Sequence, residues 1–196
     1  MLSGGVAMIL DAKRTNPKEG GPSFGFGHRL YRSVWNIAWA LFAAWTPIPL
    51  HRWRVLLARL FGGEIDWTAH IYPSARIWYP ANLSMGAHAC LAERVNCYTM
   101  APIRIGSGAV VSQGAYLCSG THDIRDPSFQ LVALPIVIGC EAWVAAESFV
   151  GPGVTIGEGA VLGARGVTLR DLEAYTVYVG NPAAAVGKRE MKDAAG

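Results

Sequence analysis

The sequence repeats a branched aliphatic residue every six positions across much of residues 65–162. The repeat slips by a ten-residue step between Val95 and Ile105, and a longer break of twenty-one residues separates Leu117 from Ile138. A helix has a period of 3.6 and a flat strand a period of 2, so neither sustains a period of six. The pattern predicts a coil of short strands, with one strand and one turn per hexapeptide. The repeat positions are Ile65, Ile71, Ile77, Leu83, Ala89, Val95, Ile105, Val111, Leu117, Ile138, Val144, Val150, Ile156 and Leu162.

Three hexapeptides make one triangular coil, and stacked coils bury the aliphatic positions inside a prism. With strands about 4.8 Å apart, the repeat predicts about five coils and a height of about 25 Å. Prisms of this type are usually left-handed, against the right-handed rule for parallel crossovers. We therefore expect an all-β fold, a left-handed parallel β-helix with a short N-terminal helical segment. A β-sandwich would show turn signals every 8 to 12 residues instead.

Composition supports a single folded domain. The chain has 196 residues, of which 52% are hydrophobic and 16% charged, which excludes an intrinsically disordered protein. The net charge of +3 is too small to indicate a nucleic-acid partner. The predicted organisation is a flexible arm (1–27), a helical cap (28–63), the β-helix (64–182) with an ejected loop (123–135), and a C-terminal tail (183–196).

An apolar, aromatic segment precedes the repeat. Residues 34–50 carry no charge, but the run is shorter than the about 20 residues that a membrane-spanning helix needs. We predict helices over about 30–45 and 52–61, with prolines between them. The second is amphipathic, because its apolar residues share one face and its arginines lie elsewhere. The apolar residues are Trp53, Leu56, Leu57 and Leu60, and the arginines are Arg52, Arg54 and Arg59.

Two readings of the first helix stay open. In one, it covers an end of the β-helix, as the terminal units of solenoids do. In the other, Trp35, Trp39 and Trp45, with arginines on both sides of them in the sequence, rest on a membrane surface or on a partner. The simpler interpretation is that the helix covers the end of the β-helix.

The longer break contains the strongest functional signal. Residues 121–135 (THDIRDPSFQLVALP) are polar, end at a proline and include His122 near their start. Loops that leave a rigid scaffold are common places for function. An alcohol needs a base to become a nucleophile near neutral pH, and imidazole titrates in that range.

Residues 30–190 resemble the hexapeptide-repeat acyltransferases. The resemblance lies in VNCYTMAPIRIG (95–106), VVSQGAYLCSGTHDI (110–124), the run PIVIG to GARGV (135–167) and GNPAA (180–184). Within this superfamily the motifs resemble the maltose and galactoside O-acetyltransferase branch and its colanic-acid-biosynthesis type. The resemblance implies acetyl-CoA as donor, no metal, a saccharide hydroxyl as acceptor and a homotrimer with active sites between prisms.

The resemblance also implies roles for individual residues. His122 is the expected general base, with Asp123, Asn96 or Glu93 as candidate partners, because the aspartate usual in the family is replaced by Met100–Pro102. Direct attack on acetyl-CoA, without an acyl-enzyme on Cys118, is expected. The backbone N–H of Ala145 or Ala146 is the expected oxyanion donor.

Further residues are assigned to substrate binding by the same resemblance. The coenzyme groove is expected along small residues, with basic side chains for the nucleotide phosphates. Glu93 and Trp143 are candidates for substrate binding, although Trp143 at a corner can equally be a packing residue. The groove residues are Ala145, Ala146, Gly163 and Ala164, and the basic ones are Arg170, Lys188 and Arg189.

Two other functions fit parts of the sequence. One is a non-catalytic scaffold that docks on a membrane or partner through the N-terminal helix. The other is a zinc carbonic anhydrase of the same fold, with His70 and His88 stacked one coil apart, but the required histidine pair five residues apart is missing at Leu117. We expect a cytoplasmic enzyme, on the inner face of the membrane if its saccharide is lipid-linked.

Overall fold

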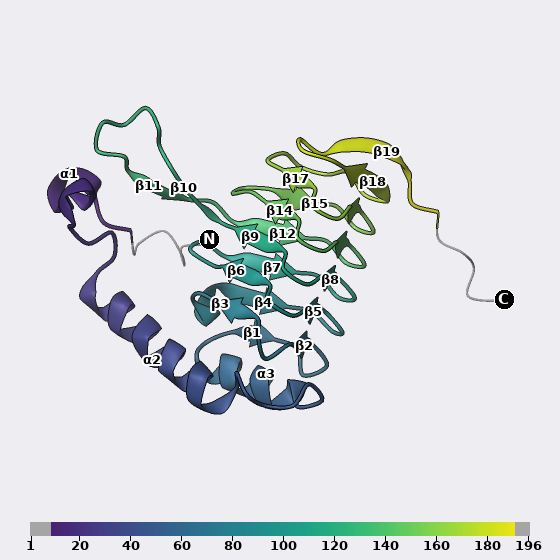
Figure 1. Ribbon diagram of the computed structural model, residues 1–196, viewed down its shortest axis with the longest axis horizontal. Helices are drawn as coiled ribbons and strands as arrows, with labels where there is room; N and C mark the ends of the chain where they lie inside the picture. Colours follow the sequence, from purple (N-terminus) through teal and green to yellow (C-terminus); the bar gives the residue numbers. More distant parts are fainter. Residues whose placement is uncertain (1–8, 191–196) are drawn as a thin grey trace.

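The computed structural model describes residues 9–190, which form a triangular stack of short parallel strands with helices along one side and at one end (Figure 1). Apart from one two-stranded hairpin, the strands form three sheets, one for each face of the triangle, and the chain visits the faces in the repeating order one, two, three. The predicted β-helix of stacked hexapeptide coils is thus confirmed.

Each face is a ladder of short strands. Face one contains β1 (Glu64–Ile65), β4 (Leu83–Met85), β7 (Ile103–Ile105), β12 (Ile136–Ile138) and β15 (Thr155–Ile156). Face two contains β2 (His70–Ile71), β5 (Cys90–Leu91), β8 (Val110–Val111), β13 (Trp143–Val144), β16 (Val161–Leu162), β18 (Thr176–Val179) and β19 (Ala184–Lys188). Face three contains β3 (Arg76–Ile77), β6 (Asn96–Tyr98), β9 (Tyr116–Cys118), β14 (Phe149–Val150) and β17 (Val167–Thr168).

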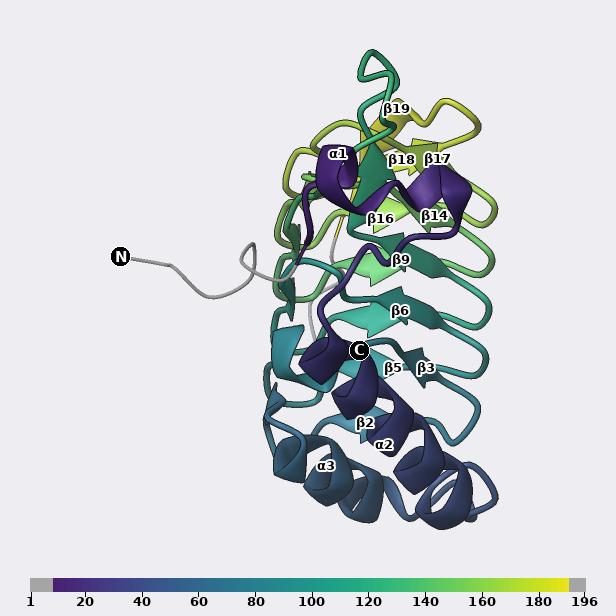
Figure 2. The same ribbon diagram turned by 90° about the vertical axis from the view of Figure 1, so that its left-hand side faces the viewer.

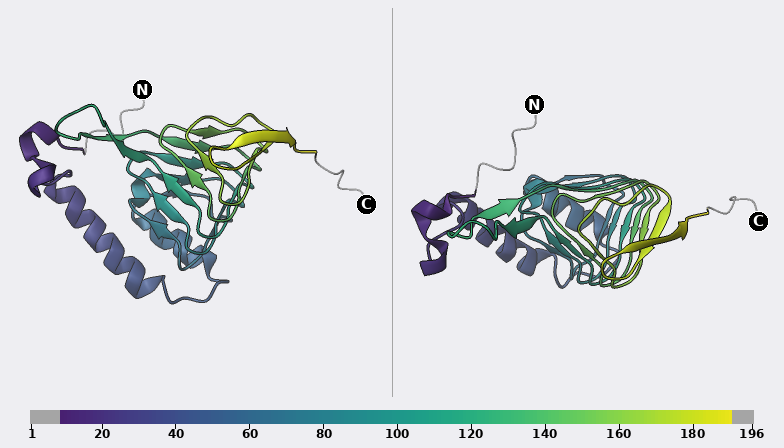
Figure 3. Two further views of the ribbon diagram at one scale, coloured as in Figure 1. Left: turned by 45° about the horizontal axis from the view of Figure 1, so that its top comes forward. Right: turned by 90° about the horizontal axis from the view of Figure 1, so that it is seen from above.

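One hairpin and several helices lie outside the prism. The hairpin, β10 (Gly120–His122) and β11 (Leu131–Ala133), projects from the edge where face three turns into face one, called the 3/1 edge below (Figure 3). The helical segments are α1 (Ala12–Thr15), η2 (Pro17–Glu19), α2 (Phe26–Phe42), α3 (His51–Leu60) and η3 (Pro80–Asn82).

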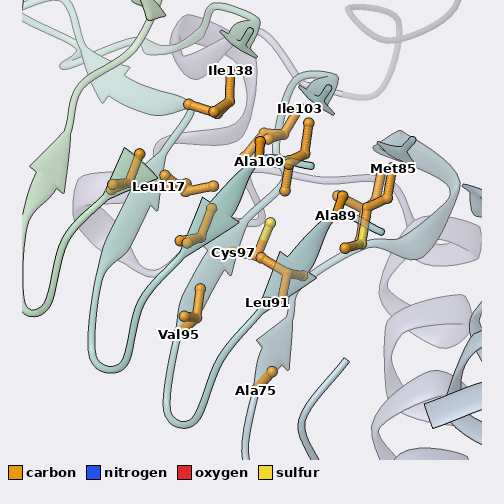
Figure 4. Close-up of a cluster of buried hydrophobic side chains, with 14 of the residues drawn as sticks. Ala75, Met85, Ala89, Leu91, Val95, Cys97, Ile103, Ala109, Leu117 and Ile138 are labelled. Carbon is orange, nitrogen blue, oxygen red and sulfur yellow. The ribbon is translucent and has the colours of Figure 1, made fainter. Parts of the chain in front are cut away.

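The core is a stack of inward side chains. Parallel pairing places Leu91 above Ile71 and below Val111, and all three are fully buried. Figure 4 shows Leu91, Cys97 and Leu117 among the side chains that fill the interior. Burial of each Leu or Val side chain contributes about 1.5–3 kcal/mol to the stability of the fold, so the stack makes the prism a stable scaffold.

The strand register corrects the position of the first break in the repeat. Met85, and not Leu83, pairs with Ile65 of the coil below, so the first coil has 20 residues rather than 18. The predicted break between Val95 and Ile105 coincides with extra residues 98–102, but the repeat missed the earlier extra residues at η3. The sequence misleads here because Leu83, Ala89 and Val95 are themselves buried.

All of the extra residues are at the 3/1 edge. They are residues 78–82, 98–102 and the hairpin segment 119–135, each one coil above the last. Buried hydroxyls join these levels: Thr99 Oγ1 accepts from Tyr79 N at 2.8 Å, and Ser119 Oγ accepts from Ala101 N at 2.9 Å. The hairpin therefore projects from an edge that contains extra residues and is held together by buried hydrogen bonds.

Helix α3, rather than the tryptophan-rich α2, covers the end of the prism. Val55, Leu57 and Ala58 of α3 pack against the first coil, where α3 contacts β1, β2 and η3. The predicted orientation of this helix is wrong in part, since Arg54 is buried while Trp53 and Leu60 are exposed. The physical reason is that backbone carbonyls of Ile71, Pro47 and Ile48 accept hydrogen bonds from the Arg54 guanidinium.

Helix α2 lies along face three instead of across the end (Figure 2). Two indoles tie it to the prism: Trp35 Nε1 donates to Ile77 O at 2.6 Å, and Trp39 Nε1 donates to Pro73 O at 3.2 Å. Trp35 is fully buried. No helix within residues 9–190 is long and apolar enough to cross a membrane.

The terminal segments have more structure than the sequence indicates. Part of the expected arm, residues 9–25, forms α1 and η2 and bonds to the hairpin 118 to 120 residues away. The expected C-terminal tail begins with β19, which pairs antiparallel with β18. The rest of both segments, residues 1–8 and 191–196, lies outside the described residues.

Candidate active site

His122 ends strand β10 of the hairpin and is half-buried. Its Nδ1 lies 2.8 Å from the carbonyl oxygen of Phe129, and its ring stacks on the Phe129 ring with centroids 4.1 Å apart and planes 11° apart. A carbonyl can only accept, so Nδ1 carries the proton and donates it. The neutral imidazole then has its lone pair on Nε2, which is the arrangement a general base needs.

The expected carboxylate partner of His122 has another role. One carboxylate oxygen of Asp123 accepts from Arg125 N at 2.9 Å, and Asp123 N donates to Gln130 O at 2.8 Å. This is a turn-forming arrangement. The sequence did not predict that a backbone carbonyl, that of Phe129, orients the imidazole.

The N-terminal segment holds the hairpin from outside. Gln130 Oε1 accepts from Ala12 N at 2.7 Å, and Gln130 Nε2 donates to Leu10 O at 3.2 Å. Lys18 Nζ donates to the carbonyl of Pro127 at the tip of the hairpin. Sequence reasoning missed these contacts because each side chain bonds to a backbone atom, and backbone atoms leave no residue-type signal.

The base of the hairpin is packed tightly. A Cβ on Gly120 would collide with the sulfur of Met100 and lie 3.3 Å from the Tyr98 ring. Met100 and Ala101 are buried. The coil where relatives are expected to carry an aspartate therefore supports the hairpin in this chain and supplies no carboxylate.

The small residues expected in the coenzyme groove line the edge where face two turns into face three, called the 2/3 edge below. Ala145 N and Gly163 N already donate to Leu162 O and Tyr178 O, at 2.9 and 2.7 Å. The N–H of Ala145, one of the two expected oxyanion donors, is therefore already used in a backbone hydrogen bond. The N–H groups of Ala146 and Ala164 make no hydrogen bond within residues 9–190, so they can donate to a ligand.

The other candidates for substrate binding lie on separate surfaces. Trp143 is on the outside of face two, where its Nε1 donates to Ser112 Oγ at 2.8 Å. Glu93 is exposed at the 2/3 edge. Asn96 faces a groove of about 940 Å³ between α2 and face three, together with Tyr98. None of these side chains contacts His122 within the described chain.

The basic candidates are also apart from the 2/3 edge. Arg170 follows β17 at the 3/1 edge. Lys188 Nζ donates to Thr176 Oγ1 at 2.7 Å and lies 3.4 Å from the Glu173 carboxylate. Arg189 Nη1 donates to Glu141 O at 2.6 Å. A phosphate at Lys188 would therefore compete with existing partners.

One chain does not bring the base and the groove together. His122 projects outward from the 3/1 edge, whereas Ala146 is at the 2/3 edge, one whole face away. Five extended residues across a face span about 16 Å. A single thioester cannot contact both groups in the same chain.

The positions of the histidines and cysteines bear on the zinc-site alternative and on the acyl-enzyme alternative. His70 pairs in register with Cys90, so the expected stacking of His70 on His88 is wrong, because this coil has 20 residues. No group of three metal-ligating side chains lies close together within residues 9–190. Burial raises the pKa of the Cys97 thiol to about 12, which keeps it protonated. The Cys118 thiol points to Gly120 O at 3.3 Å.

Comparison with known proteins places the chain among acetyltransferases, although no protein-family model matches it. It is 43% identical over 166 residues to WcaF of Escherichia coli K12, named as a colanic acid biosynthesis acetyltransferase, and the match covers 85% of this chain and 91% of WcaF.

Solved structures of the same fold agree with that comparison. A maltose O-acetyltransferase from Clostridium difficile 630 has a TM-score of 0.75 at 23% identity, covering 85% of this chain and 90% of that one. The hexapeptide-repeat acetyltransferase VCA0836 of Vibrio cholerae, complexed with acetyl coenzyme A, has a TM-score of 0.73 at 19% identity, covering 93% and 100%. The fold is the left-handed β-helix of these proteins. The chain belongs to the hexapeptide-repeat acetyltransferase family, with the colanic acid biosynthesis type.

Proposed function

We propose that this protein transfers an acetyl group from acetyl-CoA to a saccharide hydroxyl in exopolysaccharide biosynthesis, with His122 as the general base. The enzyme class, acetyl-CoA-dependent acetyltransferase, follows from family membership. The saccharide acceptor is supported by the relatives, which are named for colanic acid and maltose. The single observation that carries the role of His122 is the Nδ1 contact with Phe129 O, which leaves Nε2 as the basic atom.

The proposed reaction needs one base and one oxyanion donor. Nε2 of His122 takes the proton of the acceptor hydroxyl as its oxygen bonds to the acetyl carbonyl carbon. The carbonyl oxygen becomes an oxyanion, which the N–H of Ala146, unbonded within residues 9–190, would stabilise. When the C–S bond breaks, the imidazolium returns its proton to the leaving thiolate, and the products are CoA and the acetyl ester.

We further propose that the site forms between two copies of the chain. His122 at one 3/1 edge would meet Ala146 and Ala164 at the 2/3 edge of a neighbouring prism. Arg170, which shares the 3/1 edge with His122, would then face the same cleft. Cyclic packing of three copies gives three such clefts, in line with the expected homotrimer.

The function is tested by assaying CoA release from acetyl-CoA with maltose, galactosides and oligosaccharides from an exopolysaccharide as acceptors. We expect release that depends on the saccharide and a product from which mild alkali removes the acetyl group, because esters are labile and amides are not. An alkali-stable product would show an amino acceptor instead. If no saccharide stimulates CoA release, the proposed substrate class is wrong.

Gln130 is proposed as a positioning residue for His122. Its side chain bonds the hairpin to Ala12 and Leu10, next to the Phe129 carbonyl that orients the imidazole. Gln130→Ala is expected to lower kcat about 10-fold with little change in KM for acetyl-CoA, because a misplaced base slows only the chemical step.

The control for Gln130 is Asn16→Gly. Asn16 lies in the same N-terminal segment, has a left-handed backbone with φ of 45°, and contacts Glu19 rather than the hairpin. We expect near wild-type kcat for this variant. Equal kcat losses in both variants, or a loss in Gln130→Ala that appears only in KM, would argue against the positioning role.

A further inference from the structure

Helix α2 is apolar on two opposite sides. Trp35 and Trp39 fix one side to the prism. At about 100° per residue, the residues Phe26, Leu30, Val34, Ile37 and Leu41 fall within about 80° of each other on the other side. All five are exposed, and Phe26 is 73% exposed. With Trp45, which is 72% exposed just after α2, they are called the apolar face below.

An apolar stripe of this length is unusual on a free protein surface. Contiguous apolar patches on soluble monomers mark binding sites when they exceed a few hundred Å². The patch continues past α2, since Ile48, Leu50 and Trp53 are also exposed. The indole N–H of Trp45 is satisfied by Leu41 O at 2.7 Å, so its ring is free to enter an apolar phase.

The charges around the apolar face have one sign. Residues 20–63 contain five arginines and no Asp, Glu or Lys. Arg29 on α2 and Arg52 at the start of α3 are exposed and form no ion pair within residues 9–190. An apolar stripe with cationic flanks matches an anionic lipid surface, where the apolar groups enter the acyl boundary and the arginines meet the phosphates.

We propose that the apolar face of α2 binds the surface of an anionic membrane. A second copy of the chain fits less well, because a two-fold contact of this face with itself would bring exposed arginines together. Within the described residues no helix crosses a membrane, so the contact is interfacial. In Figures 1 and 3, α1, α2 and the hairpin lie on the same side of the prism, so the bound enzyme would hold His122 near the lipid surface.

The test is flotation of the full-length chain with vesicles of phosphatidylcholine alone or with about one third phosphatidylglycerol. We expect clear binding to the anionic vesicles and weak binding to the neutral ones. The double variant Ile37→Glu/Leu41→Glu is expected to lower the partition coefficient at least about 10-fold, since two large apolar groups are lost from the interface. Arg29→Gln and Arg52→Gln should each lower binding to anionic vesicles about fivefold.

The matched control is Leu169→Glu/Val186→Glu, which makes the same kind of change at two exposed apolar residues away from α2. We expect it to bind like the wild type. The inference is overturned if the wild type fails to float with either vesicle, or if Ile37→Glu/Leu41→Glu floats equally well. A change of oligomeric state in that variant, without vesicle binding by the wild type, would assign the face to a second copy.

Membrane binding by α2 is independent of acetyl transfer. With soluble maltose or a galactoside as acceptor, Ile37→Glu/Leu41→Glu should release CoA at the wild-type rate, because these side chains point away from the prism. Loss of vesicle binding with retained turnover separates the lipid surface from the active site. Retained vesicle binding by a chain without turnover would leave this inference standing and refute the proposed function.

Discussion

Replacing His122 with asparagine is expected to lower kcat for acetyl transfer at least about 100-fold while leaving acetyl-CoA affinity unchanged. The asparagine amide can still donate to Phe129 O, where Nδ1 donates in the wild type at 2.8 Å. It has no group in place of Nε2, so only the base is removed. The measurement is kcat from CoA release together with the acetyl-CoA dissociation constant from calorimetry.

The control for this variant is His88→Asn. His88 is exposed and has a left-handed backbone with φ of 57°, a conformation that asparagine tolerates. Its kcat should stay within about twofold of the wild type. Turnover by His122→Asn at a rate near that of His88→Asn would show that another group accepts the proton.

Replacing Arg54 with leucine is expected to destabilise the protein by about 3 kcal/mol or more. Arg54 is 0% exposed, and its guanidinium donates to Ile71 O at 2.6 Å, Thr46 Oγ1 at 2.8 Å and Pro47 O at 2.9 Å. Ile48 O accepts a further bond. Leucine would leave several buried carbonyls without a donor, at about 1–3 kcal/mol for each unsatisfied group.

Thermal unfolding measures this loss. For a chain of this size, about 3 kcal/mol corresponds to a fall in Tm of about 6–12 °C. The neighbouring Arg52→Leu is the matched control, since Arg52 is exposed and its replacement should change stability by less than about 0.5 kcal/mol. If both variants unfold at the same temperature, the buried guanidinium is not what joins α3 to the prism.

The six-residue period predicted the prism because it reports burial directly. Inward positions such as Leu91, Val111 and Val144 are fully buried in stacked register. The same property limits the prediction within the second coil, where Ala89 and Val95 are as buried as the inward residues beside them. Burial alone does not show which of two nearby buried residues is the inward strand position, so only the strand pairing fixes the register.

The candidate site was predictable only where residue type carries chemistry. His122 stands out in a polar break, and its place on the hairpin follows from that break. The contacts that orient it run through Phe129 O, Ala12 N and Leu10 O, and backbone atoms are common to every residue. Arg54 was misjudged for a related reason, because charged residues are rarely buried unless a specific set of acceptors surrounds them.

In the proposed assembly, His122 of one copy acts on acetyl-CoA held at the Ala146 edge of another copy. This arrangement is tested by mixing two inactive variants: His122→Asn, which keeps the edge, and Ala146→Trp, which keeps the base but fills the groove. After co-refolding at equal amounts, random cyclic assembly should give about one quarter of the sites an intact base and an intact edge. We therefore expect the mixture to release CoA at about one quarter of the wild-type rate. Mixed assemblies as inactive as the separate variants, or an active Ala146→Trp enzyme on its own, would show that the site does not form between two copies in this way.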